Sequence, residues 1–127
     1  MSSDEETKID VEDEKKSAKK VKAKQIESKA EFVAFQRSDK PLVIDFYASW
    51  CGPCKTIAPI LDKMVGLFPN INFVKVDVDE YDSISEEYNV KKLPTLVCKN
   101  GGDVLTYTGA GGIKDVLAFC EKYTKAT

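Results

Sequence analysis

Histidine is absent from this 127-residue sequence, and so is any long apolar run. Without histidine, the chain has neither a Ser-His or Cys-His nucleophilic pair nor a histidine-ligated metal site. No stretch approaches the roughly 20 apolar residues of a transmembrane helix. The acid-rich N-terminal segment is unlike a signal peptide or a mitochondrial transit peptide. We therefore expect no membrane association and a cytoplasmic location.

Neither sign of charge is in clear excess. Lys and Arg total 19 residues and Asp and Glu total 21, and residues 1–20 alone hold five basic and seven acidic side chains, which leaves 14 of each sign in the remainder. A balanced domain offers no basic surface to a phosphate backbone. We therefore expect no nucleic-acid binding.

Residues 1–20 form a charged segment of Asp, Glu, Lys and Ser with few apolar side chains. Such a composition cannot bury enough surface to offset the entropy lost on ordering, so we predict a disordered tail. The basic run over residues 15–24 leaves a nuclear signal or a docking arm open, although a solvated tail is the favoured interpretation. A single domain is then expected over residues 21–127.

Two of the four cysteines, Cys51 and Cys54, are separated by two residues. An apolar, strand-like segment precedes them and an amphipathic, helix-like segment follows, which places the pair at a helix N-terminus. There, unpaired backbone N–H groups and the helix dipole stabilise a thiolate at Cys51. A thiolate is the nucleophile of disulfide exchange, and Cys54, one turn later, can attack the mixed disulfide that Cys51 forms. We therefore predict an exposed, nucleophilic Cys51 and an inward-pointing, resolving Cys54.

The alternatives for the cysteines are structural. A zinc site would need two further ligands, but the sequence has no second C-x-x-C and no histidine. Structural disulfides are not expected without an export signal. Cys98 and Cys120 fall on apolar faces and are predicted to be buried and unreactive, with a regulatory role as the minor alternative.

Apolar segments alternate between strand and helix periodicity, which predicts an α/β sandwich. Ser28 and Glu31 have capping-box spacing and open a helix that buries Phe32 and Phe35. Strands are predicted over residues 21–27, 42–47, 71–76, 95–99 and 104–108, with a short helix over 82–88. Two further helices are predicted to bury the following apolar faces: Ile57, Ile60, Leu61, Met64 and Phe68, with Pro59 as a kink, and Ile113, Val116, Leu117 and Cys120.

The run from Val43 to Lys55, V-I-D-F-Y-A-S-W-C-G-P-C-K, followed by Leu93-Pro94-Thr95, resembles the thioredoxin family. The resemblance extends from about Val21 to the C-terminus. It implies the thioredoxin fold, with a mixed five-stranded sheet in the order 1-3-2-4-5 flanked by four helices. It also implies a monomeric protein-disulfide reductase that needs no cofactor and is recycled by an NADPH-dependent thioredoxin reductase. Its clients would be disulfide-containing proteins such as peroxiredoxin or ribonucleotide reductase.

Asp45 interrupts an apolar strand, where burial should raise the pKa of its carboxyl group. The resemblance implies that Asp45 is a general base that deprotonates Cys54, directly or through water. The alternative is a structural ion pair with Lys75, which matches the family's buried lysine. The two interpretations are compatible, and the catalytic one is favoured.

Pro94 is predicted either to open a strand in the trans form or, as the resemblance implies, to be cis beside Cys51, with neighbouring backbone pairing with an extended substrate. Trp50 either fills the core or recognises partners. Gly52 and Pro53 should form the strand-to-helix turn. By resemblance, the substrate-binding residues are Trp50, Gly52, Pro53, Leu93, Pro94, Thr95, Gly109 and Ala110.

Two local features stand out, of which the first departs from the family pattern. The segment between Thr95 and Gly109 is about one residue short, which leaves the register of its hairpin open. Lys91 and Lys92 should make the rim beside the dithiol more positive, which would favour acidic partners or simply solvate the loop. Two rival functions also stay open: a disulfide isomerase or oxidant, which Gly52-Pro53 disfavours, and an interaction subunit with an incidental dithiol.

Overall fold

The computed structural model describes residues 21–126, so the tail predicted over residues 1–20 lies outside the described residues. The described chain forms one mixed sheet of five strands in the order β1-β3-β2-β4-β5, as expected. Strand β2 is parallel to β3 and antiparallel to β4, while β5 is antiparallel to β4. The strands are β1 (Lys24–Gln25), β2 (Leu42–Tyr47), β3 (Asn72–Asp77), β4 (Thr95–Asn100) and β5 (Asp103–Thr108).

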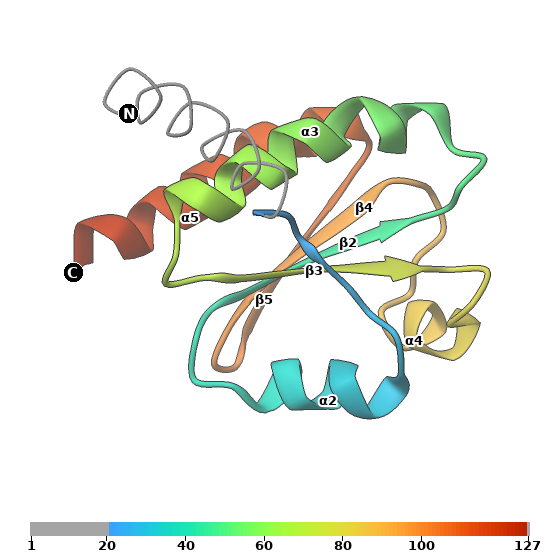
Figure 1. The fold of residues 1–127 in the computed structure, drawn as a ribbon, viewed down its shortest axis with the longest axis horizontal. Coiled ribbons are helices and arrows are strands. Elements are labelled where there is room, and N and C mark those ends of the chain that lie inside the picture. The colour runs from blue at the N-terminus through green and yellow to red at the C-terminus, as the bar shows by residue number, and fades with distance from the viewer. Residues whose placement is uncertain (1–20, 127) are drawn as a thin grey trace, which may run out of the picture.

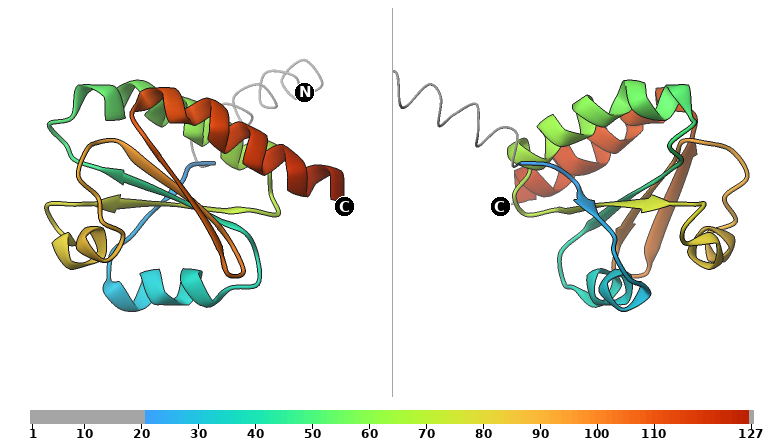
Figure 2. Two further views of the ribbon diagram at one scale, coloured as in Figure 1. Left: turned by 180° about the vertical axis from the view of Figure 1, so that it is seen from behind. Right: turned by 45° about the vertical axis from the view of Figure 1, so that its right-hand side comes forward.

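Four α-helices within residues 21–126 cover the two faces of the sheet (Figures 1 and 2). Helices α3 (Gly52–Leu67) and α5 (Ile113–Ala126) lie on one face, and α2 (Lys29–Arg37) and α4 (Asp82–Glu87) lie on the other. A short 3₁₀ turn, η1 (Ala110–Gly112), leads into α5. None of the helices in the described part of the chain is long and apolar enough to cross a bilayer.

Strand β2 is buried from Leu42 to Phe46 because helices cover both of its faces. On the α3 and α5 face, Val43 joins a cluster with Leu61 and Val116. On the other face, Ile44 and Phe46 pack with Phe32 and other apolar side chains. This two-sided burial explains why the segment is apolar on both faces and why the predicted bounds of this strand are confirmed.

Helix α2 begins as predicted. The backbone N–H of Glu31 donates to the Ser28 Oγ at 3.0 Å, which confirms the N-cap. The Glu31 carboxylate accepts from the backbone N–H of Glu27 at 2.8 Å, one residue before the position that a standard capping box uses. Phe32 is buried as expected, whereas Phe35 is half-buried.

The prediction that Ile60 and Leu117 lie in the core is wrong. Ile60 is 42% exposed and Leu117 is 38% exposed. Each helix lies on one face of a sheet and buries only a narrow stripe, so residues at the stripe's edge face solvent. In α5, the side chain of Phe119 packs in the core, whereas that of Leu117 is exposed. Helix α3 continues through Pro59 to Leu67.

Strand β1 is shorter than the predicted range of 21–27, because it is an edge strand that pairs with β3 only at Lys24 and Gln25. The register of the β4–β5 hairpin is now defined: Asn100 pairs with Asp103 and Thr95 with Thr108. Gly101 has a φ of 62°, a conformation that glycine adopts without steric cost.

We expect Gly112→Ala to destabilise the fold. An added Cβ would lie 2.8 Å from the Tyr107 Cβ, with Leu96 also in contact, so β5 and η1 would have to move apart. Overpacking of this kind costs about 1–3 kcal/mol. Gly111→Ala is the matched control, because nothing lies within 4 Å of its added Cβ. Equilibrium unfolding in urea should show a loss for Gly112→Ala and none for Gly111→Ala; equal stabilities would contradict the packing argument.

Candidate active site

Cys51 caps the N-terminus of α3. Its backbone is extended, with φ −88° and ψ 111°, and its Sγ accepts a hydrogen bond from the backbone N–H of Cys54 at 3.2 Å. Pro53 lies in the first helical turn, where no N–H hydrogen bond is required. Cys51 and Cys54 form a disulfide, with their Cα atoms 5.3 Å apart. The structure is therefore that of the oxidised protein.

Both cysteines are buried, and the prediction of an exposed Cys51 is wrong for this oxidised form. Each residue is 4% exposed. They pack with Ala48 and with the half-buried side chains of Val78 and Leu93. Burial therefore does not distinguish the two sulfurs, whereas the cavities that they line do.

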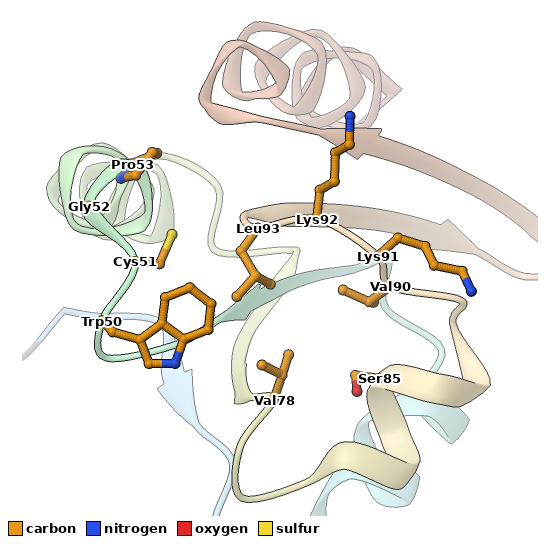
Figure 3. A pocket seen from close by; sticks show the side chains of 10 residues that line it. All are labelled: Trp50, Cys51, Gly52, Pro53, Val78, Ser85, Val90, Lys91, Lys92 and Leu93. Carbon is orange, nitrogen blue, oxygen red and sulfur yellow. The ribbon is translucent and has the colours of Figure 1, made fainter.

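Cys51 lines a groove of about 700 Å³, here named the Cys51 groove (Figure 3). Trp50 lies at its edge, 68% exposed, and its Nε1 donates to the Asp79 Oδ2 at 2.9 Å. This exposure contradicts the core-filling alternative for Trp50. The groove is lined by Trp50, Cys51, Gly52, Pro53, Val78, Ser85, Val90, Lys91, Lys92 and Leu93.

Cys54 lines a second, smaller cavity of about 240 Å³, here named the Cys54 cavity. Asp45 and Lys75 come into it from adjacent strands, where their backbones are paired in register. The cavity is lined by Asp45, Tyr47, Ala48, Ser49, Cys54, Lys55, Ala58 and Lys75. Two sides of one disulfide thus face two different environments.

The Asp45 carboxyl group is buried without a partner. The residue is 2% exposed, and neither carboxyl oxygen has a hydrogen-bond partner among the described residues. Burial raises the pKa of Asp45 to about 7; the positive charge of Lys75 opposes this rise and the negative charge of Asp62 adds to it. The predicted direction of the pKa shift is confirmed.

Lys75 forms no ion pair with Asp45 within the described part of the chain. Its Nζ lies 4.5 Å from the centroid of the Tyr47 ring, a cation–π geometry. The structural ion pair offered as an alternative is therefore not formed, because the ammonium group lies over an aromatic ring instead.

The Leu93–Pro94 peptide bond is cis, as the resemblance implied. The Pro94 carbonyl accepts from the backbone N–H of Gly109 at 2.8 Å, and the Thr95 Oγ1 donates to the Lys92 carbonyl at 2.6 Å. These bonds fix the segment that carries Leu93 against the end of β5. Gly109 has a φ of 86°, which favours glycine there.

The structure brings only part of the predicted substrate-binding set into one groove. Trp50, Gly52, Pro53 and Leu93 line the Cys51 groove. Pro94 and Thr95 are buried, and Gly109 and Ala110 are half-buried outside the groove lining, with Ala110 packed against the core.

Three groove residues were missed by sequence reasoning: Val78, Ser85 and Val90. They follow the carboxyl end of β3, where open α/β sheets bind ligands, and that position was the signal that could have identified them.

Cys98 and Cys120 are fully buried, and burial raises the pKa of each thiol to about 12, as expected for unreactive cysteines. Within residues 21–126, no cluster of His, Cys, Asp or Glu could hold a metal ion.

Comparisons with known proteins agree with this geometry. The sequence model of the family described as Thioredoxin matches residues 23–122. Thioredoxin-1 of Saccharomyces cerevisiae is 41% identical over 97 residues, covering 74% of this chain and 94% of the yeast protein. The structure of Plasmodium falciparum thioredoxin matches with a TM-score of 0.72 at 34% identity, covering 80% of this chain and 99% of that one.

A further structural match describes thiol resolution in yeast mitochondrial 1-Cys peroxiredoxin via glutathione and thioredoxin systems. Its TM-score is 0.64 at 38% identity, and it covers 73% of this chain and 94% of that one. With a buried disulfide at a helix N-terminus, a cis-proline segment and a family match over most of its length, the chain belongs to the thioredoxin family, as a thiol–disulfide oxidoreductase that exchanges disulfides through Cys51 and Cys54.

Proposed function

We propose that the chain is a general protein-disulfide reductase in which Cys51 attacks the client disulfide and Cys54 releases the product. The observation that carries this assignment is the division between the cavities: Cys51 lines the wide Cys51 groove, whereas Cys54 lines the small Cys54 cavity beside Asp45. A client chain can reach the wider groove, while the smaller cavity suits proton transfer.

The proposed cycle balances in atoms and electrons. The Cys51 thiolate attacks one client sulfur, which forms a mixed disulfide and expels the other client sulfur as a thiolate. The Cys54 thiolate then attacks the Cys51 Sγ, which forms the Cys51–Cys54 bond and releases the second client thiolate. The client gains two electrons and the protein loses two, and the structure represents this oxidised end point.

Cys54 must lose its proton before it can attack, and Asp45 is the proposed acceptor. Both residues line the Cys54 cavity. A carboxyl group with a pKa of about 7 is suited to this exchange, because general bases work best when their pKa lies near the operating pH. Neither carboxyl oxygen of Asp45 is hydrogen-bonded to a described residue, so no existing hydrogen bond has to break before Asp45 accepts the proton.

We further propose an NADPH-dependent thioredoxin reductase as the source of electrons and proteins such as peroxiredoxin or ribonucleotide reductase as clients. The peroxiredoxin proposal is supported by the matched structure that describes thiol resolution in a peroxiredoxin. A monomer in the cytoplasm remains the expectation from the sequence. The overall proposal is tested by insulin reduction coupled to NADPH consumption through a thioredoxin reductase. If the protein, already in its reduced dithiol form, does not reduce insulin, the proposal is refuted.

Trapping distinguishes the roles of the two cysteines. Cys54→Ser should accumulate covalent complexes with clients, because Cys51 can still attack but the mixed disulfide is not resolved. Cys51→Ser should trap almost none. The complexes should appear on a non-reducing gel and disappear with dithiothreitol. If Cys51→Ser trapped as much as Cys54→Ser, the assignment of nucleophile and resolving thiol would have to be abandoned.

Asp45→Asn should stabilise the fold more at high pH than at low pH. The folded carboxyl keeps its proton up to about pH 7, whereas the ordinary pKa is 3.8, so the wild-type fold loses stability as pH rises between these values. The stabilisation by Asn should therefore be about 2–3 kcal/mol larger at pH 8.5 than at pH 5. Urea unfolding at both pH values measures this difference.

The control for this variant is Asp103→Asn, at the exposed turn between β4 and β5. It should show no comparable change between the two pH values. Insulin turnover at neutral pH should fall for Asp45→Asn, because the proton acceptor is lost. Unchanged turnover would remove Asp45 from the mechanism, even if the stability result held.

Residues 1–20 should be dispensable for the chemistry, because the described site is built entirely from residues beyond Val21. A protein that begins at Val21 should reduce insulin at close to the rate of the 127-residue chain under the same conditions. A loss of more than about tenfold, equivalent to about 1.4 kcal/mol of activation free energy, would show that the N-terminal segment contributes to the site.

A further inference from the structure

The Cys51 groove carries two positive charges and no negative one. Lys91 and Lys92 are among its lining residues, and no Asp or Glu is. Figure 3 shows both side chains starting from the segment that also carries Leu93, on the other side of the groove from Gly52 and Pro53, with their ammonium ends directed away from Cys51 toward the outer rim. The rim that a client must pass is therefore cationic on one side.

Both ammonium groups are free to meet a client. Lys91 and Lys92 are exposed, and neither forms an ion pair with any described residue. The Asp79 carboxylate accepts a hydrogen bond from the Trp50 Nε1 at the edge of the groove and is paired with neither lysine. The Lys92 backbone carbonyl accepts a hydrogen bond from the Thr95 Oγ1, which leaves the ammonium group uninvolved.

Apolar groove residues supply contact without distinguishing one charged client from another. Val78, Val90 and Leu93 can pack against any side chain next to the client cysteine. The two lysines add an electrostatic interaction whose sign depends on the charge of the client residues beside the cysteine. An acidic neighbour is attracted to them, and a basic neighbour is repelled.

We propose that Lys91 and Lys92 are specificity-determining residues that make this reductase prefer protein disulfides in which Asp or Glu flanks the attacked cysteine. The preference rests on the proposed function, since it concerns which disulfide Cys51 attacks. The electron transfer is unchanged: two electrons pass from the dithiol to the client disulfide. Only the rate of the first attack differs between clients.

The test uses three disulfide-linked peptides that differ only in the residues beside one cysteine: two Glu, two Gln or two Lys. At low salt, kcat/KM for the Glu peptide should exceed that for the Lys peptide by roughly five- to tenfold, with Gln between them. Flanking charge also changes intrinsic reactivity, so each rate is divided by the rate of reduction of the same peptide by dithiothreitol.

Salt gives a measurement that needs no variant. In about 0.5 M NaCl the screening length is roughly 4 Å, so the Glu-to-Lys ratio should fall below about twofold. A ratio that does not change with salt would overturn the proposal, because a contact between exposed charges must be screened.

The double variant Lys91→Glu/Lys92→Glu should invert the ratio, with the Lys peptide now reduced faster. The matched control is Lys40→Glu/Lys63→Glu, which makes the same charge change at exposed lysines outside the groove, before β2 and in α3. The control should keep the wild-type ratio. If both doubles changed it equally, net charge and not the groove would set the preference, and the proposal would be wrong.

The failure of the preference and the failure of the proposed function are distinguishable. If the wild-type protein reduces all three peptides equally after normalisation, only the preference is overturned. If it reduces none of them, the proposed reductase function fails and the preference fails with it.

Discussion

The central strand β2 is the constraint on which the site depends. It is hydrogen-bonded to β3 on one side and β4 on the other, and helices cover both of its faces. Its end at Tyr47 is therefore fixed, and the short connection through Ala48 leads directly into Cys51 at the start of α3. The backbone N–H of Cys51 donates to the Ala48 carbonyl at 3.1 Å, which ties the disulfide to the strand. The same strand carries Asp45, so the proposed nucleophile, resolving thiol and proton acceptor share one rigid support.

Placing an ionisable group on this strand has an energetic consequence. Asp45 occupies a position where its neighbours along the chain are apolar, and burial without a hydrogen-bond partner disfavours its charged form. Lys75 offsets only part of this effect, because its ammonium group lies over the Tyr47 ring. A fully paired carboxylate would be more stable, but its pKa would be too low for it to exchange protons near neutrality. The unpaired Asp45 therefore lowers the stability of the fold, at the position where the proposed mechanism requires a carboxyl group with a pKa near neutrality.

Much of the fold could be predicted from the sequence, because its strongest signals are local. Strand β2 was bounded correctly, since an apolar run covered on both faces leaves little ambiguity. The dithiol was placed at a helix N-terminus from its flanking segments. Errors arose where tertiary contacts decide. Ile60 and Leu117 have helical core spacing, yet each helix contacts only one face of the sheet. The length of β1 depends on its single neighbour, β3.

The site shows the same limit. Residue types and spacing predicted which groups take part in the chemistry, but they did not predict the orientation or the burial of the side chains. Cys51 is buried because its sulfur is bonded to Cys54 and covered by Val78 and Leu93, which come from distant segments. Lys75 could contact Asp45 or Tyr47 from the same strand position, and only the folded geometry distinguishes the two contacts.

The charge of the domain limits how Lys91 and Lys92 can select a client. Residues 21–127 have 14 basic and 14 acidic side chains, so the net charge of the domain offers little long-range attraction to any client. Selection by Lys91 and Lys92 must then act within about a screening length of the groove, on the residues beside the client cysteine and not on the overall charge of the client.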